Sequence, residues 1–119
     1  DELLARIRAL SRRAAPARST VMVIGDLEID PTSRSVTCAG EPVRLSAREF
    51  ALLSFLAGRS GEVVTRTEIL DHVWDVNYVG MSNVVDVYVG YLRSKIDRRF
   101  DRSFIHTVRG AGYLLRAGP

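Results

Sequence analysis

Apolar residues recur at every third or fourth position between Ser82 and Arg99, which is the spacing of one face of a helix. This apolar stripe consists of Val85, Val89, Leu92 and Ile96. The opposite face mixes small, amide, hydroxyl, aromatic and cationic groups, contributed by Asn83, Val87, Gly90, Tyr91, Ser94 and Arg98. A mixed face of this kind indicates a surface that recognises a ligand. The pattern predicts a helix over residues 82–99 that is capped by Ser82.

Between residues 21 and 45 the period changes to two, which is typical of half-buried strands. The alternating runs are VMVI, LEID, SVTC and PVRL, and turn-forming residues separate them at 25–26, 30–33 and 39–41. These runs predict four antiparallel strands with one buried face. Cys38 is in phase with Val36, so it is expected to be a buried packing residue and not a reactive thiol.

Two further helices are predicted to begin at capping boxes, in which Ser46 precedes Glu49 and Thr65 precedes Glu68. The first is expected to end at Gly58, and the short segment 62–64 after it to make a single sheet contact. The segments 104–108 and 113–116 alternate around a glycine-rich turn at 109–112, which predicts a C-terminal β-hairpin.

Strands, then three helices and a hairpin define an α+β fold of the winged helix-turn-helix type. The helix from Ser82 would be the second of the helical pair, which enters the major groove of DNA, and the hairpin would be the wing. In that position Asn83 could pair with adenine, Val87 could touch a thymine methyl group, and Ser94 could reach a base or a phosphate.

Three residues carry open alternatives. Gly90 costs about 1 kcal/mol relative to alanine in a helix interior, so it indicates either a close approach to the duplex or a small residue that is tolerated. Asp86 could orient an arginine, accept a hydrogen bond from cytosine, or stabilise the start of the helix. Arg109 at the hairpin tip is either a solvated turn residue or a guanidinium that enters a narrow minor groove, whose negative potential attracts it.

The charge of the chain is unevenly distributed. Residues 82–119 hold seven basic and three acidic side chains, a local charge of 7 − 3 = +4, whereas residues 21–81 hold five and nine, or 5 − 9 = −4. The positive part coincides with the predicted helix and wing. This is either ordinary surface variation or a weak electrostatic footprint for a polyanion.

Several classes of function are disfavoured by composition. No apolar run approaches the roughly 18 residues that span a bilayer, so no membrane association is expected. The sequence has one cysteine and two distant histidines, which argues against a disulfide and a metal site. No catalytic constellation or phosphate-binding loop stands out, so neither an enzyme nor a cofactor is expected. A reduced, cytoplasmic setting is the default.

Three stretches resemble the effector domain of OmpR/PhoB-type response regulators: LSAREFALLSFLAGRSGEVVTRTEILDHVW, NVVDVYVGYLRSKID and IHTVRGAGY. The resemblance runs from about Val21 to Arg116, and its most specific pieces are VDVYVGYLRSKI and TVRGAGY. Residues 1–13 form an amphipathic pattern that resembles the last helix of the family's receiver domain. We therefore expect a receiver remnant at 1–13, a linker at 14–20 and a winged-helix domain at 21–119.

The resemblance implies a bacterial, nucleoid-associated transcription factor of a two-component phosphorelay, controlled by a sensor kinase. It implies a head-to-tail dimer on tandem half-sites of double-stranded DNA. It also implies a loop that touches RNA polymerase, formed by Asp75, Val76, Asn77, Tyr78, Val79, Gly80 and Met81.

Site residues follow from this match together with the mixed helix face. The expected major-groove set is Asn83, Val84, Val87, Tyr88, Gly90, Tyr91, Arg93, Ser94 and Arg98. Arg109 is expected in the minor groove. Contacts with DNA phosphates are expected from Arg66, Trp74, Lys95 and Thr107. One departure from the family pattern matters, because Gly90 and Tyr91 stand where relatives often have arginines. Arg93 and Arg98 are therefore expected to supply more of the affinity.

The alternative to DNA binding is a protein-interaction module on the same scaffold, since the fold need not bind DNA.

Overall fold

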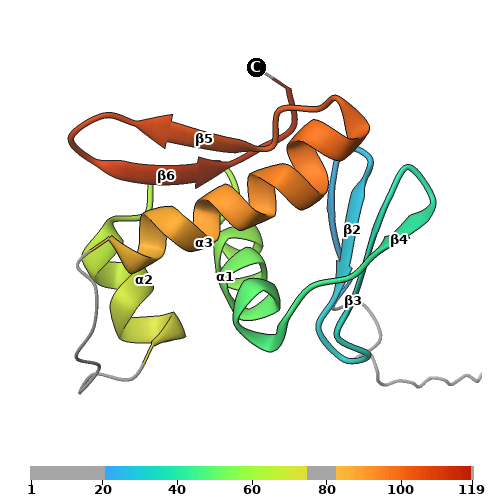
Figure 1. Cartoon of the computed structure of the whole chain (residues 1–119), viewed down its shortest axis with the longest axis horizontal. Helices are drawn as coiled ribbons and strands as arrows, with labels where there is room; N and C mark the ends of the chain where they lie inside the picture. The colour runs from blue at the N-terminus through green and yellow to red at the C-terminus, as the bar shows by residue number, and fades with distance from the viewer. Residues whose placement is uncertain (1–20, 75–82, 119) are drawn as a thin grey trace, which may run out of the picture.

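The computed structural model describes residues 21–74 and 83–118. Its first layer is an antiparallel sheet of β1 (Met22–Ile24), β2 (Leu27–Asp30), β3 (Ser35–Cys38) and β4 (Glu41–Val43), paired in that order. The helices are α1 (Ala47–Gly58), α2 (Arg66–Val73) and α3 (Val84–Leu92), and α3 leads directly into a π-helical segment, η2 (Arg93–Arg98). A second sheet pairs β5 (Ile105–Val108) with β6 (Gly112–Leu115). This is the predicted α+β architecture, with α1 behind α3 and the hairpin along one side of them (Figure 1).

The register of the first sheet confirms the predicted alternation. Ile29 pairs with Val36, and Val36 pairs with Val43, so these apolar side chains share one face. All three are buried, and Cys38 beside them is fully buried. Burial raises the pKa of the Cys38 thiol, which keeps it protonated and confirms its expected packing role.

Both predicted capping boxes are present. Ser46 Oγ accepts from the Glu49 amide at 3.2 Å, and the Glu49 carboxylate accepts from the Ser46 amide at 2.8 Å. The α1 helix ends at Gly58, as predicted, and its residues Leu52, Leu53 and Leu56 are fully buried. The helix therefore supplies the centre of the core onto which the other elements pack.

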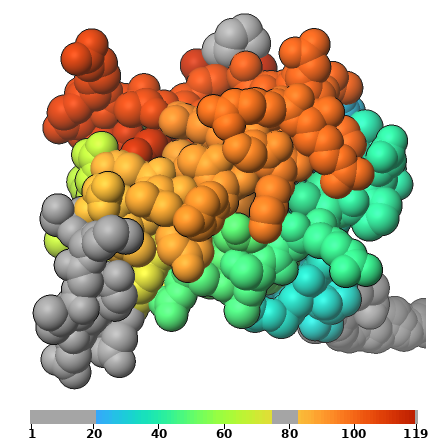
Figure 2. Space-filling view, in the orientation of Figure 1, coloured from blue at the N-terminus to red at the C-terminus, as the bar shows by residue number. Residues whose placement is uncertain are grey.

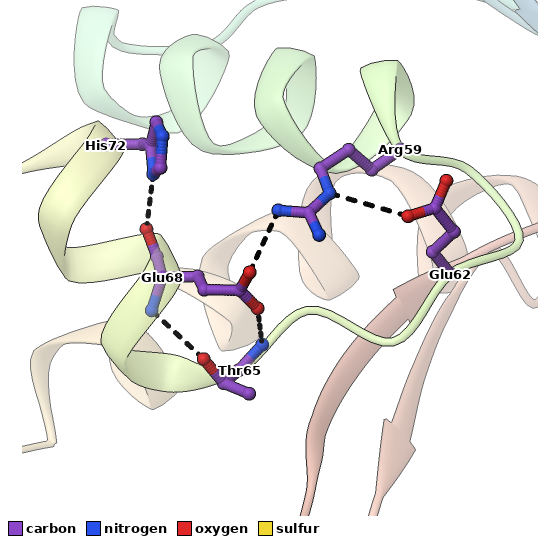
Figure 3. A network of polar contacts seen from close by, with 5 residues as sticks. All are labelled: Arg59, Glu62, Thr65, Glu68 and His72. Carbon is purple, nitrogen blue, oxygen red and sulfur yellow. Dashed lines mark hydrogen bonds and ion pairs between the residues drawn. The ribbon is translucent and has the colours of Figure 1, made fainter.

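A polar network fixes the turn from α1 to α2 (Figure 3). Arg59, just after α1, donates to Glu68 of α2 at 3.1 Å and lies 3.6 Å from Glu62. The same Glu68 carboxylate closes the capping box with the Thr65 amide at 2.9 Å. His72 bonds the Glu68 carbonyl oxygen at 2.9 Å, and its ring stacks on Phe55 of α1, with ring centroids 4.7 Å apart. The network holds the first turn of α2 in place, and Arg66 is the first residue of that turn.

The C-terminal hairpin is attached to the helical layer at its base. Val64 exchanges two backbone hydrogen bonds with Tyr113, at 2.7 and 2.9 Å, which is the predicted single sheet contact of segment 62–64. Ile105, Tyr113 and Leu115 bury one face of the hairpin in the core. The wing is thus a fixed extension of the domain.

The long C-terminal helix differs from its prediction in one respect. The predicted helix is confirmed over its described residues, but the chain is π-helical and not α-helical from Arg93 to Arg98. The first described residue of the helix region, Asn83, occupies the cap position without a side-chain cap bond. The Ser82 cap, the predicted segments 1–13 and 14–20, and the predicted polymerase-contact loop 75–81 lie outside the described residues. Within the described part, no helix is long and apolar enough to cross a bilayer.

Candidate nucleic-acid interface

The helix formed by α3 and η2 has a buried face and an exposed ridge, as its periodicity predicted. Val85, Val89, Leu92 and Ile96 are at most 1% exposed. The ridge faces solvent and lies across the front of the molecule in Figure 2. It is formed by Asn83, Val87, Gly90, Tyr91, Ser94 and Arg98, all exposed or partly exposed. Tyr91 is 47% exposed, and Arg98 donates to the Ser94 hydroxyl at 2.6 Å.

The first flank of this helix faces α2 and the hairpin through Asp86. Its carboxylate accepts from Arg66 at 2.9 Å and from the Tyr113 hydroxyl. Partial burial alone would raise the pKa of Asp86, but the hydrogen bonds from Tyr113 and Arg66 and the Arg66 charge lower it. Asp86 therefore stays ionised and holds an exposed arginine at the start of α2. Of its three open alternatives, the structure supports two: Asp86 orients an arginine, and it lies in the first turn of α3, where an acidic side chain stabilises the start of a helix.

The same flank holds the wing through Arg93 and Asp97. The Arg93 guanidinium donates to the Ile105 carbonyl oxygen at 3.2 and 3.1 Å and to the Thr107 hydroxyl at 2.6 Å. The Asp97 carboxylate accepts from the Ile105 amide at 3.2 Å. Both backbone polar groups of Ile105 in β5, its amide and its carbonyl oxygen, are thus bonded by side chains of η2. We call this arrangement the Ile105 clamp.

The Ile105 clamp directs the Arg93 guanidinium to β5 and not along the exposed ridge, and the expected major-groove contact of Arg93 stays a prediction. Sequence reasoning missed Asp97 altogether, although its spacing of four residues from Arg93 was a usable signal. Burial raises the pKa of Asp97, against the opposing effect of the Ile105 and Phe104 amides. One of its oxygens, Oδ1, is buried without a hydrogen-bond partner among the described residues.

The second flank faces the end of α2, the start of α1 and β4. Tyr88 packs edge-on against Trp74, with ring centroids 5.3 Å apart, and against Tyr91 at 5.2 Å. Lys95 donates to the buried Glu49 at 2.6 Å, and Arg99 reaches Glu41 at 3.3 Å. Cations thus line both flanks of the exposed ridge.

Two residues of the expected site belong to the core. Val84 is 4% exposed, so the prediction that it faces the groove is corrected: at the first turn of α3 this side chain packs inward. Trp74 is 6% exposed, and the Arg48 guanidinium lies 5.2 Å from its ring centre. The predicted phosphate contact of Trp74 stays a prediction, as do those of Arg66, Lys95 and Thr107.

The wing ends in a tight turn that exposes Arg109. Ala111 donates its amide to the Val108 carbonyl oxygen at 2.9 Å, and Gly110 has a φ of 78°, in the left-handed region that favours glycine. Arg109 is therefore an exposed residue of the turn that joins β5 to β6.

Replacing Gly90 with alanine is expected to raise the free energy of unfolding by about 0.5–1 kcal/mol, because glycine is a poor helix former. A Cβ at this position meets no heavy atom within 4 Å, so the domain itself has room for it. Denaturant titration measures the gain in the free energy of unfolding. The DNA affinity of the Gly90→Ala variant then distinguishes the two interpretations of Gly90. Its affinity falls if the duplex approaches this position closely, and it is unchanged if glycine is merely tolerated there. Gly58→Ala, an equally open glycine at the end of α1, is the control that should leave DNA affinity unchanged.

The exposed helix ridge, the cations on its flanks and the attached hairpin define a winged helix-turn-helix domain of the nucleic-acid-binding class. Residues 40–115 match the family described as "Transcriptional regulatory protein, C terminal". The chain belongs to this family, as a C-terminal domain of the OmpR/PhoB type, which confirms the resemblance seen in the sequence.

Three known proteins illustrate the relationship. The transcriptional regulatory protein TcrA of Mycobacterium tuberculosis is 50% identical over 116 residues, which cover 98% of this chain and 46% of TcrA. The DNA-binding domain of Klebsiella pneumoniae RstA, solved in complex with the RstA box, is 38% identical, with a TM-score of 0.72 over 82% of this chain and 97% of that one. The response regulator DrrB, a Thermotoga maritima OmpR/PhoB homologue, is 34% identical, with a TM-score of 0.73 over 82% of this chain and 44% of DrrB. The chain spans about half the length of the curated relatives it matches.

Proposed function

We propose that this domain binds double-stranded DNA sequence-specifically, as the output domain of a two-component response regulator that controls transcription. The observation that supports this most directly is the exposed ridge of α3 and η2, which has cations on both flanks and a wing carrying Arg109 at one side. A ridge of mixed polar and apolar groups matches the base edges that a major groove presents. The cations on its flanks match the phosphate walls.

In this proposal the ridge reads bases with Asn83, Val87, Gly90, Tyr91, Ser94 and Arg98, and Tyr88 supports Tyr91 through their ring contact. Arg66, Lys95 and Thr107 meet phosphates from the flanks. Because Arg66 is exposed and held by Asp86, it is already oriented before DNA arrives, which reduces the entropy lost on binding.

The wider assembly is proposed on the strength of family membership. Residues 1–13 would be the last helix of a receiver domain on which a sensor kinase acts, and 14–20 the linker to the winged helix. Two domains would bind tandem half-sites head to tail, and the loop 75–81 would contact RNA polymerase. The setting would be the nucleoid in the bacterial cytoplasm.

Selection from a pool of random duplexes, followed by footprinting, tests the proposal and supplies the operator. Specific binding predicts an enriched sequence protected by the domain, with affinity that falls steeply as salt rises, through release of counterions. A pool without enrichment would contradict sequence-specific binding. The competing protein-interaction module predicts no DNA binding at any salt concentration.

Arg109→Ala is expected to weaken binding to the selected operator by about 1–3 kcal/mol, with the largest loss where the flank is rich in A·T pairs. The reason is that a narrow minor groove concentrates negative potential on an inserted guanidinium. Fluorescence anisotropy titrations of both proteins against the same duplex measure the difference. Arg116→Ala, an exposed arginine beyond the other end of β6, is the matched control. Equal affinities of the Arg109 variant and the wild type would refute the minor-groove role.

A further inference from the structure

Two adjoining hollows lie between β4, the start of α1 and the C-terminal half of the long helix. Their volumes are about 550 and 380 Å³, and they share Pro42, Val43, Arg44 and Lys95 as lining residues. Arg99 lines the smaller hollow and bonds the Pro42 carbonyl oxygen at 3.3 Å, so β4 and η2 border one continuous depression. We call it the β4–η2 groove. In Figure 1, β4 and the C-terminal half of the long helix lie on the side of the molecule away from the wing tip.

The β4–η2 groove carries an excess of positive charge. Four cations line it, namely Arg34, Arg44, Lys95 and Arg99. Two of them are paired, Lys95 with Glu49 and Arg99 with Glu41, so the local balance is 4 − 2 = +2.

The remaining two cations are placed to receive an anion. Arg34 lines the larger hollow, and its guanidinium lies 4.8 Å from the centre of the Phe50 ring. Arg44 is exposed, and no acidic side chain of the described residues forms an ion pair with it. Arginines that form no ion pair within residues 21–74 and 83–118 favour an anionic ligand that offers hydrogen-bond acceptors, and phosphate oxygens fit this requirement well.

The position of the groove relative to the helix identifies the source of that phosphate. A helix with its side chains is about 10–12 Å across, and the major groove is about 12 Å wide, so a helix lying in it approaches both sugar-phosphate walls. The first flank, with Arg66 and Thr107, would meet one wall. The second flank runs from Tyr88 through Lys95 to Arg99 and opens directly onto the β4–η2 groove.

We propose that the β4–η2 groove binds the DNA backbone that forms the second wall of the major groove, with Arg44 and Arg34 contacting its phosphates. The inference rests on the proposed DNA binding and extends it to residues outside the helix and wing. Arg44 lies at the junction of the first sheet with α1, so the sheet side of the domain takes part in binding. These contacts would strengthen binding to every sequence about equally and would carry no base preference.

The test compares Arg44→Gln with Arg116→Gln on the selected operator, using the whole chain. Both variants remove one positive charge from an exposed arginine, so a general effect of net charge is the same in both. Affinities are measured across a series of salt concentrations. Loss of one phosphate contact predicts that the slope of log K against log salt becomes shallower by about 0.9 for Arg44→Gln. The slope of Arg116→Gln should equal that of the wild type, and thermal unfolding checks that both variants are folded.

A second arm locates the contact on the DNA. Duplexes with a single neutral methylphosphonate, moved one position at a time, should weaken wild-type binding at one or two wall positions and leave Arg44→Gln unaffected at those same positions. Equal slopes for the two arginine variants, or equal sensitivity of wild type and Arg44→Gln to every methylphosphonate, would overturn the proposal. If Arg109→Ala still weakens binding in that case, only the groove assignment fails. If no duplex binds the wild type, the proposed function itself fails.

Discussion

Gly112→Ala is expected to lower the free energy of unfolding by about 3 kcal/mol or more, and to detach the wing from the helical layer. A Cβ at Gly112 would lie 2.0 Å from the Val64 carbonyl oxygen and 2.9 Å from Thr65 Cα. Both contacts are with backbone, so no side-chain rotation relieves them. The residue also has a φ of 152°, a conformation that L residues rarely adopt. Urea unfolding of both proteins, followed by circular dichroism, measures the loss.

Gly110→Ala separates the two causes of this effect. Gly110 also has a positive φ, of 78°, but nothing lies within 4 Å of a Cβ placed there. It should therefore show only the cost of the left-handed conformation, about 1 kcal/mol. A Gly112→Ala protein as stable as Gly110→Ala would mean that the Val64 bridge can shift to admit the methyl group, and that the base of the wing is less fixed than the contacts indicate.

The fold could be predicted where local signals decide it. Alternation in segments such as SVTC sets which side chains face the core, and Val36 and Cys38 are buried accordingly. The capping boxes at Ser46 and Thr65 mark helix starts, because the side chain that caps the helix lies within the same few residues. The exposed ridge of α3 follows from the helical period in the same way.

The site could be predicted only in part, because several of its contacts join residues far apart in the sequence. Periodicity places Arg93 near the ridge. Its contact with Ile105 could not be predicted in this way, because it depends on how the hairpin packs against the helix and on the π-helical geometry of η2. Nothing in the pattern around Val84 indicates that the first turn of α3 is buried on this side. The β4–η2 groove likewise combines Arg44 with a helix half a chain away. Charge counted along the sequence could not reveal it, because residues 21–81 are acidic overall.

Arg93→Ala is expected to lower the free energy of unfolding by about 2 kcal/mol and to weaken DNA binding without a change of base preference. The substitution removes both guanidinium donors to the Ile105 carbonyl oxygen. A carbonyl oxygen left without a hydrogen-bond partner in a partly buried site costs about 1–3 kcal/mol. It also releases Thr107 from the helix. Binding should weaken because the wing is then held less firmly relative to the ridge. Unfolding titrations and repeated selection from random duplexes measure the two effects.

A double-mutant cycle with Arg109→Ala decides whether Arg93 acts through the wing. If Arg93 positions the hairpin, loss of Arg93 also removes part of what Arg109 contributes, so the two losses in binding free energy should differ from additivity by more than about 0.5 kcal/mol. Arg98→Ala supplies the comparison, because Arg98 lies on the exposed ridge and bonds only Ser94 among the described residues. Its variant should keep its stability and add to Arg109→Ala independently. An Arg93 variant with wild-type stability, additive losses and an altered base preference would instead assign Arg93 to direct reading of the major groove.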